Sequence, residues 1–239
     1  MSTEVRFTTE NLDQYMKALA KAYKKLGGKT MPAEIILIGG AAVLADYGFR
    51  EATYDIDAII SASSAMEDAI RAVTDEYDLP NGWLNEDFRK TASYTPKLAQ
   101  YSRHYKTFYG VVTVRIVTGE YLVAMKMVSA RQYKNDLSDI VGIIGEHQRR
   151  NSPLTLQMID RAVQELYGSW ERISDETKNM VEAALEQPNV SALYQKYRAS
   201  ETEAEAILLD FQQEHPTGVR ETDIAGILAL ARAKKKDRS

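Results

Sequence analysis

The chain contains no cysteine, and this absence excludes several kinds of chemistry at once. A protein without cysteine has no disulfide framework, no thiolate zinc site and no cysteine nucleophile. Its histidines, His104, His147 and His215, have no partner at helical metal-ligand spacing, so a histidine-rich metal site is not indicated either. The lack of cysteine is compatible with a reducing cytoplasm.

Long apolar runs and an excess of positive charge are also missing. No apolar run approaches the roughly 20 residues that a membrane-spanning helix needs, and the first residues lack the basic-then-apolar pattern of a signal peptide. We therefore expect a cytoplasmic protein with no membrane partner. The formal net charge of −4 leaves no overall basic footprint for nucleic acid, although a local basic groove stays open.

The pattern of apolar residues predicts an α+β fold, in which a mixed sheet is flanked by helices. Apolar residues at steps of three and four predict a helix over residues 10–26, and short apolar runs predict strands over 34–38, 54–60 and 111–117. The stretch 98–109 fits both a helix and a strand, and we favour a strand.

The second part of the chain differs, because every segment from Asn151 onward has a helical pattern. We therefore predict a mixed α/β domain over residues 1–150 and an all-helical C-terminal domain over residues 151–239. The polar stretch HQRRNSP, at residues 147–153, is the expected boundary.

Two aspartates interrupt the second predicted strand. Side chains alternate along a strand, so Asp55 and Asp57 share one face while Ile56 points to the other, into the core. Two carboxylates on one face repel each other and lose hydration, which raises their pKa values unless positive charge lies between them. A divalent cation supplies that charge most simply, and Mg²⁺ prefers oxygen ligands. The alternative is that both aspartates cap a loop or pair with basic side chains such as Arg50.

Two adjacent glycines, Gly39 and Gly40, follow the first predicted strand and precede a predicted helix. Backbone N–H groups at such a helix start bind anions, most often phosphate. Gly-Gly alone is also an ordinary turn. A phosphate-binding turn beside a two-carboxylate metal site would together bind a nucleoside triphosphate (NTP) with its Mg²⁺.

These motifs together resemble the nucleotidyltransferase superfamily with the DNA polymerase β-type palm. The pattern is an apolar strand, two glycines, 14 intervening residues and then Asp-Ile-Asp. The stretch GGAAVLADYGFREATYDID is similar to bacterial minimal nucleotidyltransferases, including the toxins of abortive-infection (AbiE-type) toxin–antitoxin pairs. Such proteins carry a later helix with a lysine, then an arginine and an aspartate-containing helix. This chain follows that order with Lys126, Arg131, Asp136 and Asp139, and the resemblance covers about residues 34–147.

The resemblance implies a role for each matching residue. Gly39 and Gly40 would contact the triphosphate through their backbone N–H groups. Asp55 and Asp57 would act in catalysis by coordinating Mg²⁺, or Mn²⁺ in its place. Lys126 would reach a phosphate, whereas without the resemblance it would be taken for an exposed helix lysine.

Four further residues have roles that the sequence leaves open. Asp136 would be an acidic catalytic member of the site, a partner that orients Lys126 or Arg131, or a first-turn aspartate that stabilises its own helix. Arg131 is expected to bind nucleotide or phosphate. Arg50 and Thr53 lie just before the metal strand and would contact nucleotide, unless Arg50 pairs with an aspartate.

One feature of the superfamily is missing from this chain. Many members carry a third carboxylate on a neighbouring strand, where it helps to deprotonate the attacking hydroxyl. The matching strand here, VVTVRIVT, carries Thr113 and Arg115 and no acid, and Glu120 is better explained as a helix-start charge. Asp136 is the residue that would replace the missing acid.

The predicted function is Mg²⁺-dependent transfer of a nucleoside monophosphate (NMP) from an NTP to an acceptor hydroxyl. The toxin-type resemblance implies tRNA or another RNA as acceptor and an antitoxin as protein partner, while a protein or small-molecule acceptor stays open. The alternative is a catalytically degenerate nucleotide-binding or protein-interaction module of the same fold. Four tyrosines are expected to pack against the core rather than stack on nucleobases, namely Tyr94, Tyr101, Tyr105 and Tyr109.

Overall fold

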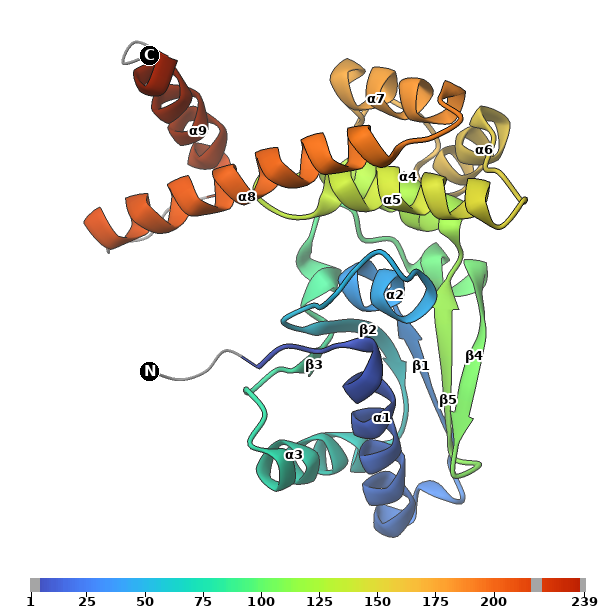
Figure 1. Cartoon of the computed structure of the whole chain (residues 1–239). Helices are drawn as coiled ribbons and strands as arrows, with labels where there is room; N and C mark the ends of the chain where they lie inside the picture. The colour runs from blue at the N-terminus through green and yellow to red at the C-terminus, as the bar shows by residue number, and fades with distance from the viewer. Residues whose placement is uncertain (1–4, 216–220, 237–239) are drawn as a thin grey trace.

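The first half of the chain contributes all the strands of a mixed five-stranded sheet. The computed structural model describes residues 5–215 and 221–236. Its strands are β1 Ala33–Leu37, β2 Ile56–Ser61, β3 Leu84–Asn85, β4 Ser102–Phe108 and β5 Val112–Val117. They lie in the order β3-β2-β1-β5-β4, as Figure 1 shows. β1 pairs antiparallel with β2 and parallel with β5.

Helices make up most of the remaining described chain. The α-helices are α1 Thr9–Tyr23, α2 Gly39–Asp46, α3 Ala65–Tyr77, α4 Gly119–Ser129, α5 Asp136–Arg149, α6 Leu156–Tyr167, α7 Asp175–Glu186, α8 Ser191–Glu214 and α9 Glu221–Lys236. Shorter helical turns are η1 Lys24–Gly28, η2 Asp87–Lys90 and η3 Pro96–Tyr101. None of the described helices combines the length and apolar character needed to cross a bilayer.

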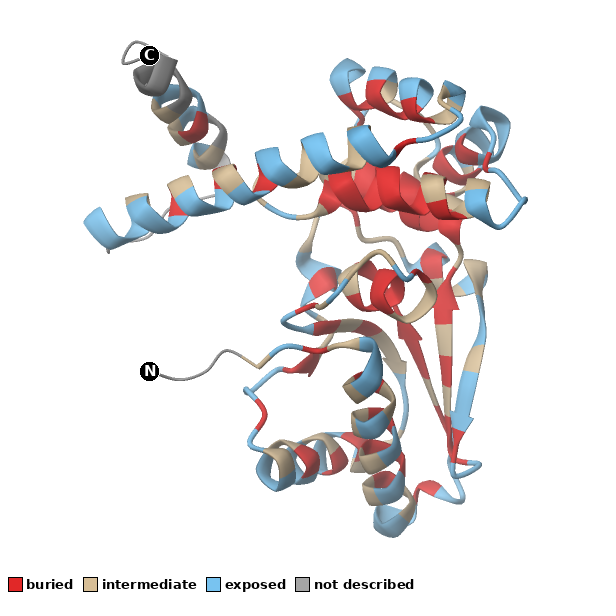
Figure 2. Cartoon of the chain, in the orientation of Figure 1, coloured by how far each residue is buried: buried red, intermediate tan, exposed pale blue. Residues whose placement is uncertain are grey.

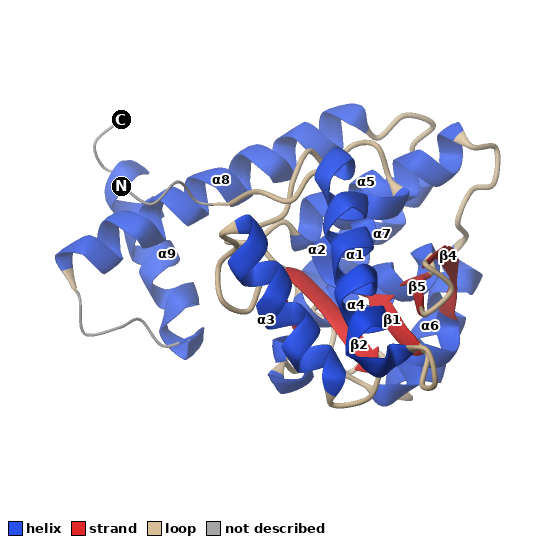
Figure 3. Cartoon of the chain, turned by 90° about the horizontal axis from the view of Figure 1, so that it is seen from below, coloured by secondary structure: helices blue, strands red, loops and turns tan. Residues whose placement is uncertain are grey.

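The helices form two groups around the sheet. α1 and α3 lie side by side against one face of it (Figures 1 and 3), whereas α4 to α8 gather beyond the end of the sheet where β1 and β5 finish (Figure 1). This arrangement confirms the predicted α+β fold with a helical C-terminal region. It also leaves the start of α2 between the sheet and the second group of helices.

The three predicted strands are confirmed, with ends that shift by one or two residues. The ambiguous stretch 98–109 forms the edge strand β4, preceded by the turn η3. Its exposed side chains include Arg103, His104 and Lys106. Charged side chains on an edge strand oppose pairing with another chain.

α4 is buried on all sides, which has a direct consequence for the site. Every residue from Tyr121 to Met127 is buried, as the colouring in Figure 2 shows for the helices above the sheet. A helix that is covered all round is normally apolar all round. Lys126 breaks that rule, because its charged side chain is only 4% exposed.

Helices on both sides of residue 150 share one hydrophobic core. The same buried cluster contains Ile35 of β1, Ile144 of α5, Ile159 of α6 and Val181 of α7. A smaller cluster joins α8 to α9 and includes Leu208 and Leu228. The predicted division into two domains at residue 150 stays a prediction.

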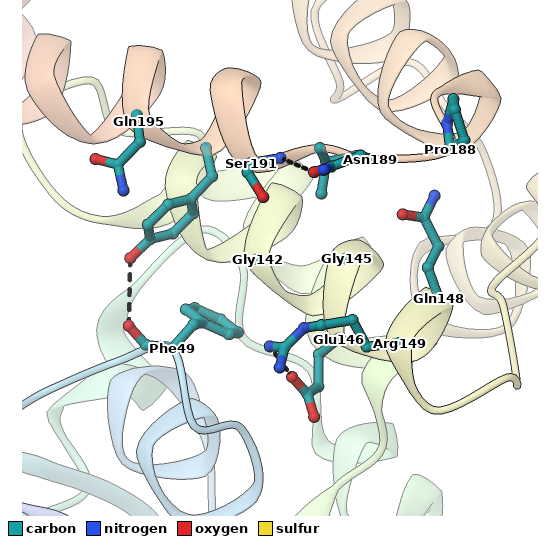
Figure 4. A pocket seen from close by; sticks show the side chains of 12 residues that line it. Phe49, Gly142, Gly145, Glu146, Gln148, Arg149, Pro188, Asn189, Ser191 and Gln195 are labelled. Atoms are coloured by element: carbon teal, nitrogen blue, oxygen red, sulfur yellow. Dashed lines mark hydrogen bonds and ion pairs between the residues drawn. The ribbon is translucent and has the colours of Figure 1, made fainter.

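Two glycines let neighbouring segments approach α5 closely. A Cβ at Gly142 would lie 2.5 Å from atoms of the Phe49 ring, and a Cβ at Gly145 would lie 2.5 Å from a methyl carbon of Val190. These residues line a cavity of about 390 Å³ between Phe49, α5 and the start of α8, which Figure 4 shows. The packing bears on the candidate site because Phe49 directly precedes Arg50.

Gly142→Ala is expected to lower the free energy of unfolding by about 2 kcal/mol, because the added methyl group overlaps the Phe49 ring. That ring contacts Tyr47 and Tyr194, so a shift that makes room for the methyl group disturbs both contacts. Urea unfolding measures the change. The control is Gly48→Ala, which has nothing within 4 Å of its Cβ and should shift stability by less than about 0.5 kcal/mol. Equal losses in both variants would contradict this account.

Candidate functional site

One cavity of about 600 Å³ brings together every residue that the sequence singled out for the site. It lies between the start of α2 and β2 on one side and α4, α5 and α8 on the other. The nine residues are Gly39, Gly40, Arg50, Thr53, Asp55, Asp57, Lys126, Arg131 and Asp136.

The two glycines form the first turn of α2, directly after β1. Gly39 has a φ of +53°, a left-handed conformation that favours glycine, and a Cβ there would lie 3.4 Å from Oδ2 of Asp57. A Cβ on Gly40 would lie 2.8 Å from both Nη2 of Arg50 and Oγ1 of Thr53. The first N–H groups of a helix have no partner inside it. The helix start predicted at the glycines is therefore present, with bare backbone N–H groups beside the two aspartates.

Asp55 and Asp57 lie where β2 begins, in a segment anchored on both sides. The N–H of Ile56 donates to the carbonyl of Trp83 at 2.8 Å, and the N–H of Ile38 donates to the carbonyl of Asp57 at 3.1 Å. Ile56 is buried, whereas Asp55 is exposed and Asp57 is half-buried, as the predicted alternation requires. β2 begins at Ile56, so Asp55 lies in a bend just before the strand and not inside it as predicted. Burial, followed by the charge of Asp55, raises the pKa of Asp57 to about 6.

The neighbourhood of this pair also lacks a third carboxylate. β5 borders β1 and not β2, so the expectation that its Thr113 and Arg115 would stand on the strand next to Asp57 is wrong. The strands that border β2 are β1 and β3, and Asn85 of β3 pairs with Asp57. Across the described residues, no group of three or more His, Cys, Asp or Glu side chains could hold a metal ion.

Lys126 and Asp136 form the centre of a buried ion network. Nζ of Lys126 lies 3.1 Å from Oδ1 of Asp136 and 2.9 Å from Oδ2 of Asp139. Burial alone would lower the pKa of Lys126, but the two aspartates outweigh it and raise that pKa. Burial alone would raise the pKa of Asp136, but the charges of Lys126 and Arg131 hold it below its usual range. Lys126 and Asp136 are therefore both charged at neutral pH.

Two arginines extend this network to the cavity. Nε of Arg131 donates to Oδ2 of Asp136 at 2.8 Å, while the arginine side chain stays 31% exposed. Arg50 forms an ion pair with Asp139, and its Nε donates to the carbonyl of Ala52 at 3.1 Å. Pairing with an aspartate was the alternative that the sequence left open for Arg50, and the partner comes from α5.

Both carboxylate oxygens of Asp136 are already engaged. Oδ1 accepts from Lys126 at 3.1 Å and from Nη2 of Arg131 at 3.3 Å, and Oδ2 also accepts the backbone N–H of Arg131 at 3.2 Å. The residue is 2% exposed. These contacts favour the orienting role among the alternatives left open, and a catalytic role for Asp136 stays a prediction.

The cavity also contains residues that the sequence did not single out. Lys134, on the loop between α4 and α5, lowers the pKa of Asp57 through its charge, although burial and Asp55 outweigh it. Arg198 and Glu205 reach the cavity from α8. No local motif marks them, because α8 arrives at the cavity only through the tertiary fold.

The tyrosines behave largely as expected. Tyr94, Tyr101 and Tyr105 pack against the hydrophobic core. Tyr109 departs from the expectation, because it sits in the turn between β4 and β5 and is 51% exposed. Tyr54, which is 52% exposed, lines the cavity next to Asp55 in the sequence, and Tyr133 lines it as well.

The donor set fits a hard divalent cation that binds together with its substrate. Mg²⁺ is commonly held by one or two carboxylates and completes its shell with water and substrate phosphates. Asp55 and Asp57 would supply two carboxylates, and the first N–H groups of α2, which line the same cavity, would face the phosphates of such a substrate. The carboxylate pair and the start of α2 would act together, since a cation held by the carboxylates completes its shell with phosphate oxygens.

Comparison with known proteins adds a family to this geometry. The sequence matches the model of a family described as nucleotidyltransferase of unknown function (DUF6036) over residues 14–146. No curated protein and no solved structure matches the chain. The matched region contains all nine of the predicted site residues. Because the match spans more than half of the 239 residues, the chain belongs to this nucleotidyltransferase family.

Proposed function

We propose that the chain transfers an NMP from a magnesium-bound NTP to an acceptor hydroxyl and releases pyrophosphate. The observation that carries this proposal is the proximity of the first turn of α2 to the aspartate pair. A Cβ on Gly39 would come within 3.4 Å of Oδ2 of Asp57. A phosphate bound at the helix start would therefore lie beside the carboxylates, as a metal-bound triphosphate requires.

Each part of the site has its own task in this reaction. The backbone N–H groups of Gly39 and Gly40 bind the triphosphate. Asp55 and Asp57 hold Mg²⁺, or Mn²⁺, which when bound neutralises negative charge on the phosphate oxygens. Positioning and electrostatics account for most catalysis of phosphoryl transfer. The chain therefore has to align the acceptor oxygen, the α-phosphorus and the departing pyrophosphate.

Arg131 is the cation that we assign to the phosphates. Its side chain is 31% exposed in the cavity, whereas that of Lys126 is 4% exposed and lies between two aspartates. Lys126 acts by fixing Asp136, and Asp136 acts by fixing Arg131 at the cavity wall. This assignment replaces the direct phosphate contact that the resemblance implies for Lys126.

For the acceptor we propose an RNA, with tRNA as the first candidate, or a protein hydroxyl. For the biological role we propose the toxin of a toxin–antitoxin or phage-defence pair. The support for both is the likeness of residues 39–57 to toxin-type enzymes. The cavity continues beyond the aspartates to Arg198, Glu205 and Leu209 of α8, which leaves space for an acceptor. Labelled NTP offered separately to total RNA and to a protein extract distinguishes the two acceptor classes.

A second candidate function is nucleotide binding without transfer. The observation that favours it is the missing third acid: Thr113 and Arg115 stand on β5, and Asn85, which pairs with Asp57 across β2 and β3, does not line the cavity. Calorimetry with Mg²⁺ and each NTP, run beside the transfer assay, separates the candidates. Tight binding without turnover supports this second function, and a lack of binding removes both.

Asp55→Asn and Asp57→Asn are each expected to reduce NMP transfer by about 100-fold or more, because each removes a charged cation ligand from a preorganised site. Transfer of radiolabelled NTP measures the loss. The control is Glu51→Gln, an exposed acid close in sequence that does not line the cavity. Equal labelling by the wild type and both asparagine variants would refute the proposed function.

Lys126→Ala and Arg131→Ala are expected to fail in different ways. Lys126→Ala should lower the free energy of unfolding by about 3 kcal/mol, because it leaves two buried aspartates without their common partner. Arg131→Ala should cost about 1 kcal/mol and weaken NTP binding about tenfold, since its side chain is partly exposed. Urea unfolding and calorimetry measure the two effects. The assignment is wrong if Arg131→Ala is the more destabilising variant.

A further inference from the structure

A residue from the helical region caps the start of α5. Oε1 of Glu201, on α8, accepts the backbone N–H of Leu137 at 2.8 Å and that of Ser138 at 3.2 Å. Both N–H groups belong to the first turn of α5 and have no acceptor within that helix. Glu201 is 2% exposed, so its carboxylate is committed to this contact.

A buried carboxylate is a costly way to cap a helix, and the residue that would normally cap α5 does not do so. The residue before α5 is Asn135, a type that often caps a helix itself. It makes no side-chain cap hydrogen bond here. Its Oδ1 instead accepts from Nη1 of Arg198 on α8, at 2.5 Å. Glu201 of α8 therefore caps α5, and Arg198 of α8 binds the Asn135 side chain that would otherwise have done so.

Two properties of the Glu201 carboxyl group show that its burial is unfavourable. Burial raises the pKa of its carboxyl group to about 7. Its second oxygen, Oε2, is buried without a hydrogen-bond partner. Neither feature is explained by the stability of α8 alone, because an apolar residue would fill the same space without an unsatisfied oxygen.

The capped turn is the one that carries the ion network. Asp136 and Asp139 stand in the first turn of α5, on either side of Leu137 and Ser138. A displacement of this turn would move both aspartates away from Lys126. Because that lysine is buried, its partners have no solvent to compensate for a lost contact.

The packing of α8 along α5 holds Glu201 in register with this turn. Val190 and Tyr194 lie at the other end of the contact, where Gly145 allows close approach and the Tyr194 hydroxyl donates to the carbonyl of Phe49 at 3.5 Å (Figure 4). Residues seven positions apart return to the same side of a helix. Tyr194 and Glu201 have that spacing, so both face α5.

We propose that Glu201 is a positioning residue of the nucleotide site, which holds Asp136 and Asp139 in place by capping α5 from α8. It contacts neither nucleotide nor cation in this role and acts through the aspartates. The inference rests on the proposed transfer function. It makes α8 a part of the catalytic unit, although the family match ends at residue 146.

Substitution of Glu201 by glutamine, aspartate or alanine tests the inference, because the three variants separate the length of the side chain from its negative charge. Glu201→Gln keeps an oxygen at the same distance, whereas Glu201→Asp keeps the charge and loses one methylene of reach. The glutamine variant should retain kcat/KM within about threefold, and the aspartate and alanine variants should lose about tenfold through misalignment of the site. Asp210→Asn, an exposed acid on the same helix that does not line the cavity, is the matched control and should match the wild type.

Two further measurements do not depend on turnover. Amide hydrogen exchange at Leu137 and Ser138 should accelerate in Glu201→Asp and Glu201→Ala and stay near wild type in Glu201→Gln. Calorimetry with Mg²⁺ and NTP should show binding weakened about tenfold in the same two variants, because Arg131 loses its alignment. If Glu201→Ala does not fold, the comparison of the aspartate and glutamine variants decides the question.

The inference is overturned if Glu201→Gln loses as much activity and affinity as Glu201→Asp, or if Glu201→Ala retains the wild-type values. A wild type that binds NTP and transfers nothing would refute the proposed transfer alone. In that case the affinities and exchange rates of the same variants still decide whether Glu201 positions the site.

Discussion

A lysine buried between two aspartates is the interaction on which the candidate site depends. Lys126 is 4% exposed on a helix that is covered on every side, and a charge in that position needs partners of opposite sign. Asp136 and Asp139 provide them and thereby fix the start of α5 against α4. Removing any one of the three charges takes a buried partner of opposite sign away from the others, so they act as a unit.

The network explains how the cavity obtains two chemically different walls. The sheet contributes the bare N–H groups of α2 and the carboxylates of Asp55 and Asp57. The helices beyond the sheet contribute Asp136 and Asp139 of α5, which pair with Arg131 on the loop before α5 and with Arg50 on the segment before β2. The positive charges of Arg131 and Lys134 act across the cavity on Asp57, but they do not offset its burial and the repulsion by Asp55. That residual cost is what a bound divalent cation would relieve.

The helical region takes part in this arrangement and does more than cover the core. Glu201 and Arg198 of α8 attach to the first turn of α5 and to the residue before it. The same helix lines the far side of the cavity. A single element therefore contacts the first turn of α5 at one point and lines the cavity at another. Its alignment along α5 depends on Gly142 and Gly145, which allow neighbours to approach that helix closely.

The sequence by itself determined the parts of the site that local geometry controls. The residues around Ile56 predict that Asp55 and Asp57 lie on either side of a buried position, and two glycines between an apolar strand and a helical pattern predict a helix start whose first N–H groups have no partner inside the helix. The α+β fold followed from the periods of the apolar residues in the same way. These features depend only on neighbours within a few residues.

Only the tertiary structure decided the roles of the charged residues. The burial of Lys126 depends on the helices that cover α4, and the partner of Arg50 lies on α5, 89 residues away. β2, which carries Asp57, is bordered by β1 and β3 and not by β5, because pairing order is set by the whole sheet. Glu201 has no local signal at all, since its function comes from an N–H pair more than 60 residues earlier. Burial and ion pairing join distant segments, and the pattern of residues along one segment does not contain that information.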